Sequence, residues 1–346
     1  MAIIRLGALG SVVTLRLADR WGRRPLLLVS VLAFTLLTGA TAAASGLALF
    51  VVLQLLARVF LTTEETLAGV VLTEELRPEH RGAGIGMLGI ISTAGFGLVA
   101  ILLLLVDQTP LGWRLFYLVA LVPLAVVIYL RRNLSETRAY ALAAATDRVH
   151  RSWWPDLAPT DARHLRRLLV VLAAMGMLAT SSFFFAAELA QDDYGWKGLF
   201  TLIVFAAAPT TLLGYIAGGR LSDRFGRKPV LASSVLTLSA GAVPVFSGLP
   251  VLYAPGFFLM AGADAAVQAV RSAFAGELFP TEVRGTLGAV AGAVVVVAGS
   301  AGLLLAGALA SVVSPSVTVL GLAGVAAASV LSLRGLPETA GTDVLS

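Results

Sequence analysis

The sequence predicts an all-α membrane protein of two pseudo-symmetric helical bundles, with about 11 transmembrane helices divided five and six. Hydrophobic residues make up 58% of the 346 residues, charged residues only 13%, and the mean hydropathy is +0.90. Ordinary soluble domains carry about 25% charged residues. A charged motif also occurs twice, each time between long apolar runs. Together these observations indicate two homologous membrane half-domains.

Three short motifs repeat at nearly constant spacing along the chain. LADRWGRRP at 17–25 recurs as LSDRFGRKP at 221–229, an offset of 204 residues. EELRPEHRG at 74–82 is matched by ELFPTEVRG at 277–285, and LSET at 134–137 is matched by LPET at 336–339, with offsets of 203 and 202. One register held over the whole length favours duplication over chance.

Five candidate spans form the first half, each close to the roughly 20 apolar residues that a helix needs to cross a bilayer. They are 1–17, 26–45, 47–73, 84–106 and 113–130. The first charged motif separates the first two spans, and the second motif separates the third from the fourth. Glycines at the start of the fourth span are typical of closely packed membrane helices.

Six candidate spans form the second half and repeat this order. They are 166–189, 197–219, 229–247, 251–275, 286–310 and 315–333. The expected domains are a transmembrane half at 1–131, a cytoplasmic linker at 132–165, a second transmembrane half at 166–334 and a cytoplasmic tail at 335–346. The linker reads as a loop with interfacial tryptophans at Trp153 and Trp154, or as a site for a regulatory partner.

The two halves differ at their starts. Two spans precede the charged motif in the second half, but only one precedes it in the first. The first half is therefore expected to lack its first helix, through a misplaced start codon or a truncation.

Lysine and arginine set the expected orientation. If the motif turns, the linker and the C-terminal end share one side, that side holds 20 of the 25 basic residues. This side should be cytoplasmic, with the C-terminus inside, in a multi-pass protein of the plasma (inner) membrane. The basic residues then face the membrane boundary, which explains the net charge of +5 without a nucleic-acid partner.

The duplicated turn resembles the signature turn of the major facilitator superfamily, and the residues that carry the resemblance are Asp19, Arg20, Gly22, Arg23 and Arg24 with Asp223, Arg224, Gly226, Arg227 and Lys228. Arg58 resembles the arginine of that family's fourth-helix motif. The resemblance implies two six-helix bundles around a central cavity that opens alternately to either side. The ending Pro337-Glu338-Thr339 resembles that of sugar porters, but the span 166–189 lacks their paired glutamines and asparagine. The pattern is closer to proton-coupled metabolite or organic-acid symporters.

The resemblance also implies a gating role for the repeated motifs on the cytoplasmic side. The residues of this expected latch are the ten just named, together with Glu74, Arg81, Glu277 and Arg284. A carboxylate in such a turn can accept guanidinium hydrogen bonds and face a helix N-terminus. The alternative is a basic turn that only orients the protein in the membrane.

Charged residues inside spans are costly and are functional candidates. The candidates for substrate binding and proton coupling are Gln54, Arg58, Glu64, Glu65, Asp264, Gln268 and Arg271. At about 100° per residue, Gln54, Arg58 and Glu65 share one helix face, whereas Glu64 points away from it. Asp264, Gln268 and Arg271 repeat this geometry in the second half, so both faces are expected to line the central cavity.

Two roles follow for these side chains. A carboxylate near the middle of a membrane can exchange a proton, and an arginine can bind a carboxylate substrate through two parallel hydrogen bonds. The alternative is mutual neutralisation, in which arginines and acids only hold the bundle together.

The sequence contains no residues that indicate a metal site, another cofactor or a nucleotide-binding loop. The chain has no cysteine, and its three histidines lie in polar loops, so neither a metal site nor another cofactor is expected. No Walker-type phosphate loop is present. The expected partners are a small-molecule substrate, protons and the lipid bilayer, and the expected state is a monomer.

The sequence therefore favours a secondary active transporter over an enzyme. The leading hypothesis is proton-coupled symport of a small organic metabolite, an organic acid or a sugar-like compound, by alternating access. The alternatives are proton-driven efflux of drug-like compounds or metabolites, and a truncated remnant or sensor that does not transport.

Overall fold

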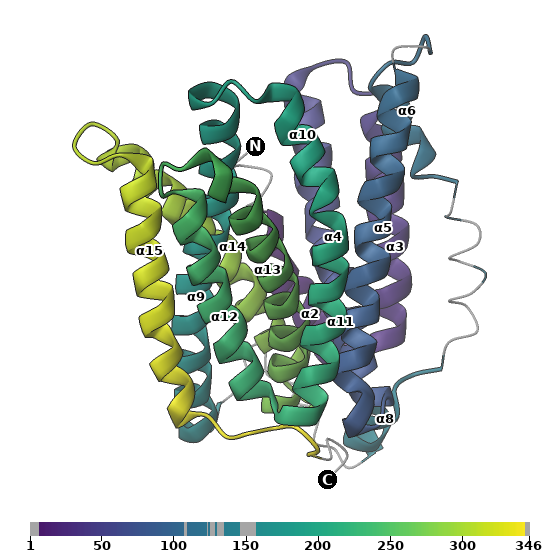
Figure 1. The fold of residues 1–346 in the computed structure, drawn as a ribbon. Coiled ribbons are helices and arrows are strands. Elements are labelled where there is room, and N and C mark those ends of the chain that lie inside the picture. The colour runs from purple at the N-terminus through teal and green to yellow at the C-terminus, as the bar shows by residue number, and fades with distance from the viewer. Residues whose placement is uncertain are drawn as a thin grey trace.

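The structure, a computed structural model, describes residues 7–106, 109–122, 124, 129, 135–145 and 157–342, and gives the backbone alone for 96–106. Within these residues the regular structure is entirely helical, and the long helices run side by side as one bundle (Figure 1). The predicted all-α class is confirmed.

In the described part of the first half, four long helices and one short helix lie within or close to the predicted spans. They are α2 (Gly7–Trp21), α3 (Arg23–Thr41), α4 (Leu47–Glu75), α5 (Arg81–Val106) and α6 (Arg114–Val119), with a 3-10 turn at Pro78–His80. Residues 123, 125–128 and 130 of the span predicted at 113–130 lie outside the described residues. A short helix, α8 (Arg138–Ala145), lies inside the predicted linker, and Trp153 and Trp154 lie outside the described residues.

The second half repeats this arrangement. Its helices are α9 (Pro159–Glu188) with a π-helical turn at Leu189–Asp193, α10 (Lys197–Ala206), α11 (Ala208–Phe225), α12 (Arg227–Val245), α13 (Pro250–Leu278), α14 (Arg284–Leu309) and α15 (Pro315–Ser329) with a 3-10 turn at Val330–Gly335. The predicted span 197–219 is broken into α10 and α11, because Pro209 stands in the first turn of α11 and lacks a backbone N–H donor. Helix α9 begins at Pro159, inside the predicted linker, since proline is favoured at a helix start.

Eight helical segments in the described part of the chain are long and apolar enough to cross a membrane, judged by length and composition. They comprise α3, α4, α9, α10 with α11, and α12 to α15. The outer surface of the bundle carries many exposed large apolar side chains, such as Leu213 and Val251. A lipid-facing surface accounts for such exposure, which a soluble surface would not.

Each charged motif forms a turn of a single residue between two helices. Helix α2 continues to Trp21 and α3 starts at Arg23, so Gly22 alone makes the turn; Gly226 does the same between α11 and α12. The φ and ψ angles are 109° and 159° at Gly22 and 103° and 156° at Gly226. Only glycine adopts this conformation readily. The charged side chains of each motif are therefore held on rigid helix ends.

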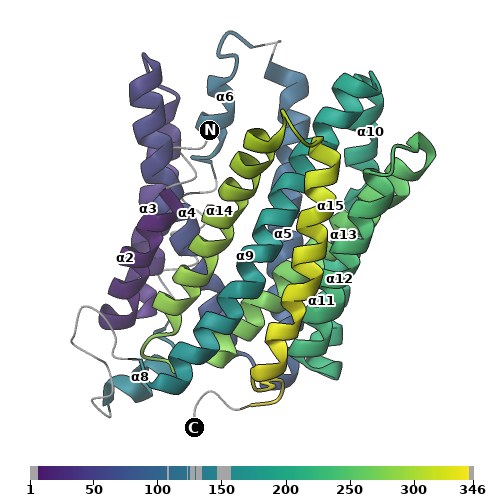
Figure 2. The same cartoon turned by 90° about the vertical axis from the view of Figure 1, so that its left-hand side faces the viewer.

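Helices of the two halves interlock. Helix α14 of the second half packs against α2 and α4 of the first as well as against α9 (Figure 2), and α5 packs against α11 and α13. Glycines allow the close approach of α5 to α11: a Cβ at Gly86 would lie 2.5 Å from the carbonyl oxygen of Tyr215. Small residues serve this purpose in membrane bundles, where the hydrophobic effect does not drive helices together.

The end of the bundle that carries α8 and the C-terminal segment is called the basic end below, and it is the lower end in Figure 1. Both glycine turns lie there, because Glu136, just before α8, contacts the first turn and Glu338 of the C-terminal segment contacts the second. The basic end is thus built from the repeated motifs.

Replacing Gly226 by alanine should destabilise the protein by about 1–3 kcal/mol, the usual cost of a residue held in a backbone region reserved for glycine. The added Cβ would also lie 2.7 Å from Oε2 of Glu338. Thermal unfolding in detergent measures the effect. Gly324→Ala is the control, because Gly324 lies inside α15 with open space around it and should be neutral or slightly stabilising. Equal midpoints for the two variants would contradict the strain argument.

Candidate functional site

Two groups of charged side chains connect the halves at the basic end, and the repeat of the sequence relates one group to the other. Each group contains an aspartate, a glutamate and two arginines, one arginine from each half of the chain. A third group lines a cavity further along the bundle.

In the first group, Asp19 at the end of α2 binds the start of α14 in the other half. Its Oδ2 accepts hydrogen bonds from the backbone N–H of Thr286 at 2.7 Å and from its hydroxyl at 2.6 Å, and its Oδ1 accepts from the N–H of Gly285 at 3.1 Å. The first N–H groups of a helix have no partner within the helix and lie at the positive end of its dipole. Asp19 therefore caps a helix of the opposite half.

Glu74 at the end of α4 completes this group. Its Oε1 lies 3.2 Å from Nη2 of Arg23 in its own half and 2.9 Å from Nη1 of Arg284 in the other. Its Oε2 accepts from the hydroxyl of Thr137 at 2.6 Å. Arg23 also pairs with Asp19 at 3.0 Å. These side chains are buried, so each charge depends on the others for compensation.

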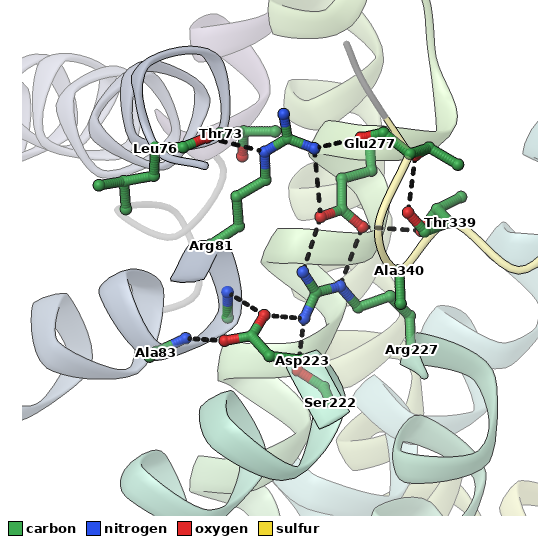
Figure 3. Close-up of polar contacts among 12 residues, drawn as sticks. Thr73, Leu76, Arg81, Ala83, Ser222, Asp223, Arg227, Glu277, Thr339 and Ala340 are labelled. Atoms are coloured by element: carbon green, nitrogen blue, oxygen red, sulfur yellow. Dashed lines mark hydrogen bonds and ion pairs between the residues drawn. The ribbon is translucent and has the colours of Figure 1, made fainter. Parts of the chain in front are cut away.

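In the second group, Asp223 at the end of α11 binds the start of α5 in the first half (Figure 3). Its two oxygens accept from the backbone N–H groups of Gly82 and Ala83, both at 2.8 Å. Arg227 donates to Oδ1 of Asp223 at 2.6 Å and to the hydroxyl of Ser222 at 2.8 Å. Asp223 thus caps the start of α5 as Asp19 caps the start of α14.

Glu277 has the role of Glu74 in this group (Figure 3). Arg227 binds it with two parallel hydrogen bonds, Nη2 to Oε1 at 2.7 Å and Nε to Oε2 at 2.9 Å. Nη1 of Arg81, from the first half, lies 3.8 Å from Oε1, and the hydroxyl of Thr339 donates to Oε2 at 2.8 Å. Paired arginine–carboxylate contacts of this kind are strong and directional.

Two further glutamates, absent from the predicted sites, cap helices at the glycine turns. Oε1 of Glu136 accepts from the N–H of Arg23 at 2.8 Å, and Oε1 of Glu338 accepts from the N–H of Arg227 at 2.7 Å. The third repeated motif, with its offset of 202 residues, was the signal that could have located both. Its role became visible only in the structure, which places Glu136 beside the start of α3 and Glu338 beside the start of α12.

The environment of Glu338 shifts its pKa. Burial alone would raise the pKa of this carboxyl, but backbone N–H groups of Arg227, Lys228, Thr339 and Ala340 donate to it and hold its pKa below the usual 4.5. Hydrogen bonds from N–H groups favour the charged form.

Four predicted latch residues lie outside the two buried groups. The backbone carbonyl of Arg20 accepts from the hydroxyl of Tyr140 on α8, and the N–H of Arg24 donates to Glu136. The guanidinium of Arg224 stacks on the ring of Phe225, 5.2 Å from its centre, and the ammonium of Lys228 donates to the carbonyl of Leu336 at 2.6 Å. The structure thus separates the buried cross-half contacts from peripheral basic residues.

The third group lines a cavity of about 310 Å³ between the halves. Arg58, Glu65 and Thr62 reach it from α4, and Gln268, Arg271 and Ser272 reach it from α13. The remaining lining residues are largely apolar or small and come from α5, α9 and α14 as well as from α4 and α13. Helices α4 and α13 are equivalent positions of the two repeats. Of the six residues predicted to face the cavity, the four that line it are Arg58, Glu65, Gln268 and Arg271.

Charges of both signs meet at this cavity. Arg58 of α4 and Arg271 of α13 both act electrostatically on Glu65. Nε of Arg271 donates to Oε1 of Gln268 at 2.6 Å. Asp264 precedes Gln268 by one turn of α13 and, contrary to the prediction, does not line the cavity. It lies within the electrostatic range of Arg271, and its Oδ1 is buried with no hydrogen-bond partner in the described residues. The buried Nε of Arg58 and hydroxyl of Thr62 also have none there.

Three expectations for the cavity need correction or addition. Gln54 does not line it, because its amide donates to the hydroxyl of Thr41 on α3 at 2.9 Å. Glu64 does not line it either, as its helical phase predicts. Tyr215 of α11 was missed: it lies close enough to Asp264, Arg271 and Glu65 to interact with all three charges. A single tyrosine in an apolar span gave no periodic signal.

No group of three or more metal-binding side chains occurs in the part of the chain that the structure describes. A bundle of membrane-spanning helices, built from two repeats that meet at a charged cavity, defines a polytopic membrane transporter of the secondary class. The model of the Major Facilitator Superfamily matches residues 2–216 and 201–344, nearly the whole chain. The chain belongs to this superfamily, whose members are transporters and not enzymes.

Individual relatives are distant. A Cupriavidus pinatubonensis protein named "Probable 4-methylmuconolactone transporter" is 24% identical over 294 residues, which is 83% of this chain and 67% of the relative. Among solved structures, a human organic anion transporter is 18% identical with a TM-score of 0.79, covering 96% of this chain and 82% of its own. A proton:xylose symporter is 15% identical with a TM-score of 0.79, covering 99% and 86%. These structures confirm the fold.

Removing one cross-half cap should open the basic end. In Asp19→Asn and Asp223→Asn we expect a cysteine placed in the cavity at Ser272 to react roughly tenfold faster with a membrane-impermeant maleimide applied from that end. Hydrogen bonds to a charged group each stabilise by about 1.5–3 kcal/mol, enough for such a shift. The chain has no cysteine of its own, so the label reports this position alone.

The control for this experiment is Glu79→Gln, which removes an exposed acid from the 3-10 turn at the same end. Its labelling rate should match that of the parent protein. Equal rates in all three variants would mean that the aspartates do not hold the basic end closed.

Glu338 should give the protein a pH-dependent contribution to stability. Its pKa is lowered on folding, so its stabilisation is fully present above about pH 4.5 and is lost as pH falls through the folded-state pKa. The difference in thermal midpoint between the parent protein and Glu338→Gln should be constant from pH 7 to 5.5 and shrink below pH 4.5. A difference that persists unchanged to pH 3.5 would contradict the capping role.

Proposed function

We propose that the protein is a proton-coupled symporter that carries a small organic acid across the membrane by alternating access. The observation that carries this proposal is the meeting of Arg58, Glu65 and Arg271, from equivalent helices of the two halves, at one cavity. Intramembrane charges on facing helices are costly unless they bind substrate, ions or one another.

The two arginines suit an anionic substrate. A guanidinium offers a rigid fork that matches a carboxylate, and Arg58 and Arg271 reach the cavity from opposite halves. A substrate bound to both arginines would draw the two halves together at the cavity. The volume of about 310 Å³ suits a small molecule. The names of two similar proteins, a methylmuconolactone transporter and an organic anion transporter, agree with this substrate class.

Glu65 is the proposed proton carrier. It lines the cavity and faces both arginines, so its charge state alters how strongly they attract an anion. Loading a proton on Glu65 would free the arginines for the substrate, which couples the two bindings. The fold is shared with a proton:xylose symporter.

The latch residues serve the conformational cycle in this proposal. The caps of Asp19 and Asp223 and the pairs of Glu74 and Glu277 hold the basic end closed in the state described here. Opening that end requires all of them to separate, so water must replace the lost contacts. We place this end on the cytoplasmic side of the plasma membrane by its excess of basic residues, and we propose a monomer with a helical half on each side of the linker.

Proton-driven efflux of drug-like compounds fits the cavity less well. Such a carrier needs a broad apolar and aromatic surface, whereas none of the described residues that line this cavity is aromatic. The charged groups instead provide a few directed contacts for a small polar ligand.

Replacing Glu65 by glutamine should abolish proton-driven uptake, because an amide cannot exchange a proton. Arg58→Lys should reduce uptake of an anionic substrate at least roughly tenfold, since lysine cannot offer the planar fork. The measurement is a screen of radiolabelled small carboxylic acids in proteoliposomes, with and without an inward proton gradient.

Glu64→Gln is the matched control, since Glu64 neighbours Glu65 in sequence but does not line the cavity. It should retain most of the uptake. Wild-type proton-coupled uptake by Glu65→Gln would remove the proposed proton role, and no uptake of any acid by the parent protein would remove the substrate class.

A further inference from the structure

A second cavity, of about 850 Å³, lies on the outer face of the second half and shares no lining residue with the cavity of Arg58 and Glu65. It is a groove with walls of α11 and α12 and a floor of α13, and both wall helices pack on α13 (Figure 1). The walls join at the tight turn of Gly226, so Phe225 and Pro229 close the groove at the basic end. Leu213, Leu221 and Leu259 line it with well-exposed side chains, so it is open along its length.

The groove is apolar in spite of several hydroxyl groups. Four hydroxyl side chains line it, those of Thr210, Ser233, Ser234 and Thr237. All but that of Ser234 donate to a carbonyl three or four residues earlier in the chain, at 2.7, 3.1 and 2.8 Å for Thr210, Ser233 and Thr237 respectively. These groups present methyl and methylene surface to the groove. Its α11 wall runs from Thr210 to Phe225, about 22 Å at 1.5 Å per residue. One leaflet of hydrocarbon is about 15 Å thick, so an acyl chain fits along it.

Two arginines stand at the closed end of this groove. At 100° per residue, Arg224 falls within the arc of α11 that lines the groove, and Arg220 lies next to its outer edge. Both side chains are exposed, and neither has an ion-pair partner among the described residues. Arg224 stacks on Phe225, which lines the groove. By contrast, the neighbouring Arg227 is buried and neutralised by Asp223 and Glu277.

We infer that this groove is a binding site for one anionic phospholipid of the leaflet at the basic end. An acyl chain occupies the apolar groove over α13, and the phosphate binds Arg224 and Arg220 at the membrane boundary. Arginine side chains reach from the lipid face to the polar interface and pair with phosphate. The site is separate from the substrate cavity, so it stands whether or not the proposed transport is correct.

Two features distinguish this site from the layer of lipid that surrounds every membrane protein. The groove is recessed and has a closed end, which fixes the position of one chain. The uncompensated charge sits only at that end, so the site discriminates by headgroup. Each basic residue near an anionic surface contributes about a fivefold factor in affinity, so the two arginines together favour an anionic over a zwitterionic lipid by roughly 25-fold.

Native mass spectrometry of the purified chain in detergent tests the inference, with dioleoylphosphatidylglycerol and dioleoylphosphatidylcholine titrated separately. The parent protein should hold one phosphatidylglycerol roughly 25-fold more tightly than phosphatidylcholine. Arg220→Gln with Arg224→Gln should remove this preference. Ala217→Phe with Ser233→Phe, both exposed positions on facing walls, should fill the groove and weaken both lipids without touching the arginines.

The matched control is Arg163→Gln with Arg166→Gln, two exposed arginines of α9 near the same end of the bundle. It removes the same charge and should leave the preference intact. Equal affinity for both lipids in the parent protein, or equal loss in the control, would overturn the proposal. A dimer that dissociates in the groove-filled variant would also overturn it, by showing that a second copy occupies the groove.

Discussion

The structure depends on the pairing of buried charges between its two halves at the basic end. Glu74 and Glu277 each lie between an arginine of their own half and an arginine of the other. Removing one partner from such a buried group leaves an uncompensated charge, which typically costs about 3–5 kcal/mol. The groups therefore close together or separate together, because partial separation is the most costly arrangement. Such behaviour suits an element with two discrete states.

Duplication explains why this arrangement is possible. Asp19 caps α14 and Asp223 caps α5, so each half supplies both a carboxylate and a helix N-terminus to the other. The glycine turns keep each aspartate and its arginine four residues apart on adjoining helix ends. Glu136 and Glu338 then fix the start of the helix that carries the arginine. One set of contacts, used twice, holds the two bundles face to face.

The latch and the cavity are joined through Arg284. This residue binds Glu74 at 2.9 Å and also lines the cavity that contains Arg58 and Glu65. A rearrangement of the cavity lining would therefore involve a member of the latch directly. Tyr215 makes a comparable link on the other side, because it packs on α5 and interacts with Asp264 and Arg271.

The sequence by itself determined the helical class, most of the spans, the repeat and four of the polar residues that line the cavity, Arg58, Glu65, Gln268 and Arg271. These follow from local properties: apolar length, 100° periodicity and motif spacing. It also separated Glu64 from Glu65 by helical phase. Only the tertiary structure decided that Asp19 binds α14, that Arg284 pairs with Glu74, and that Gln54 turns to Thr41. These contacts join residues far apart in the chain, and no local pattern encodes which helices will be neighbours. The repeat showed that the two charged groups are equivalent, but the packing of the helices decided which residues each group binds.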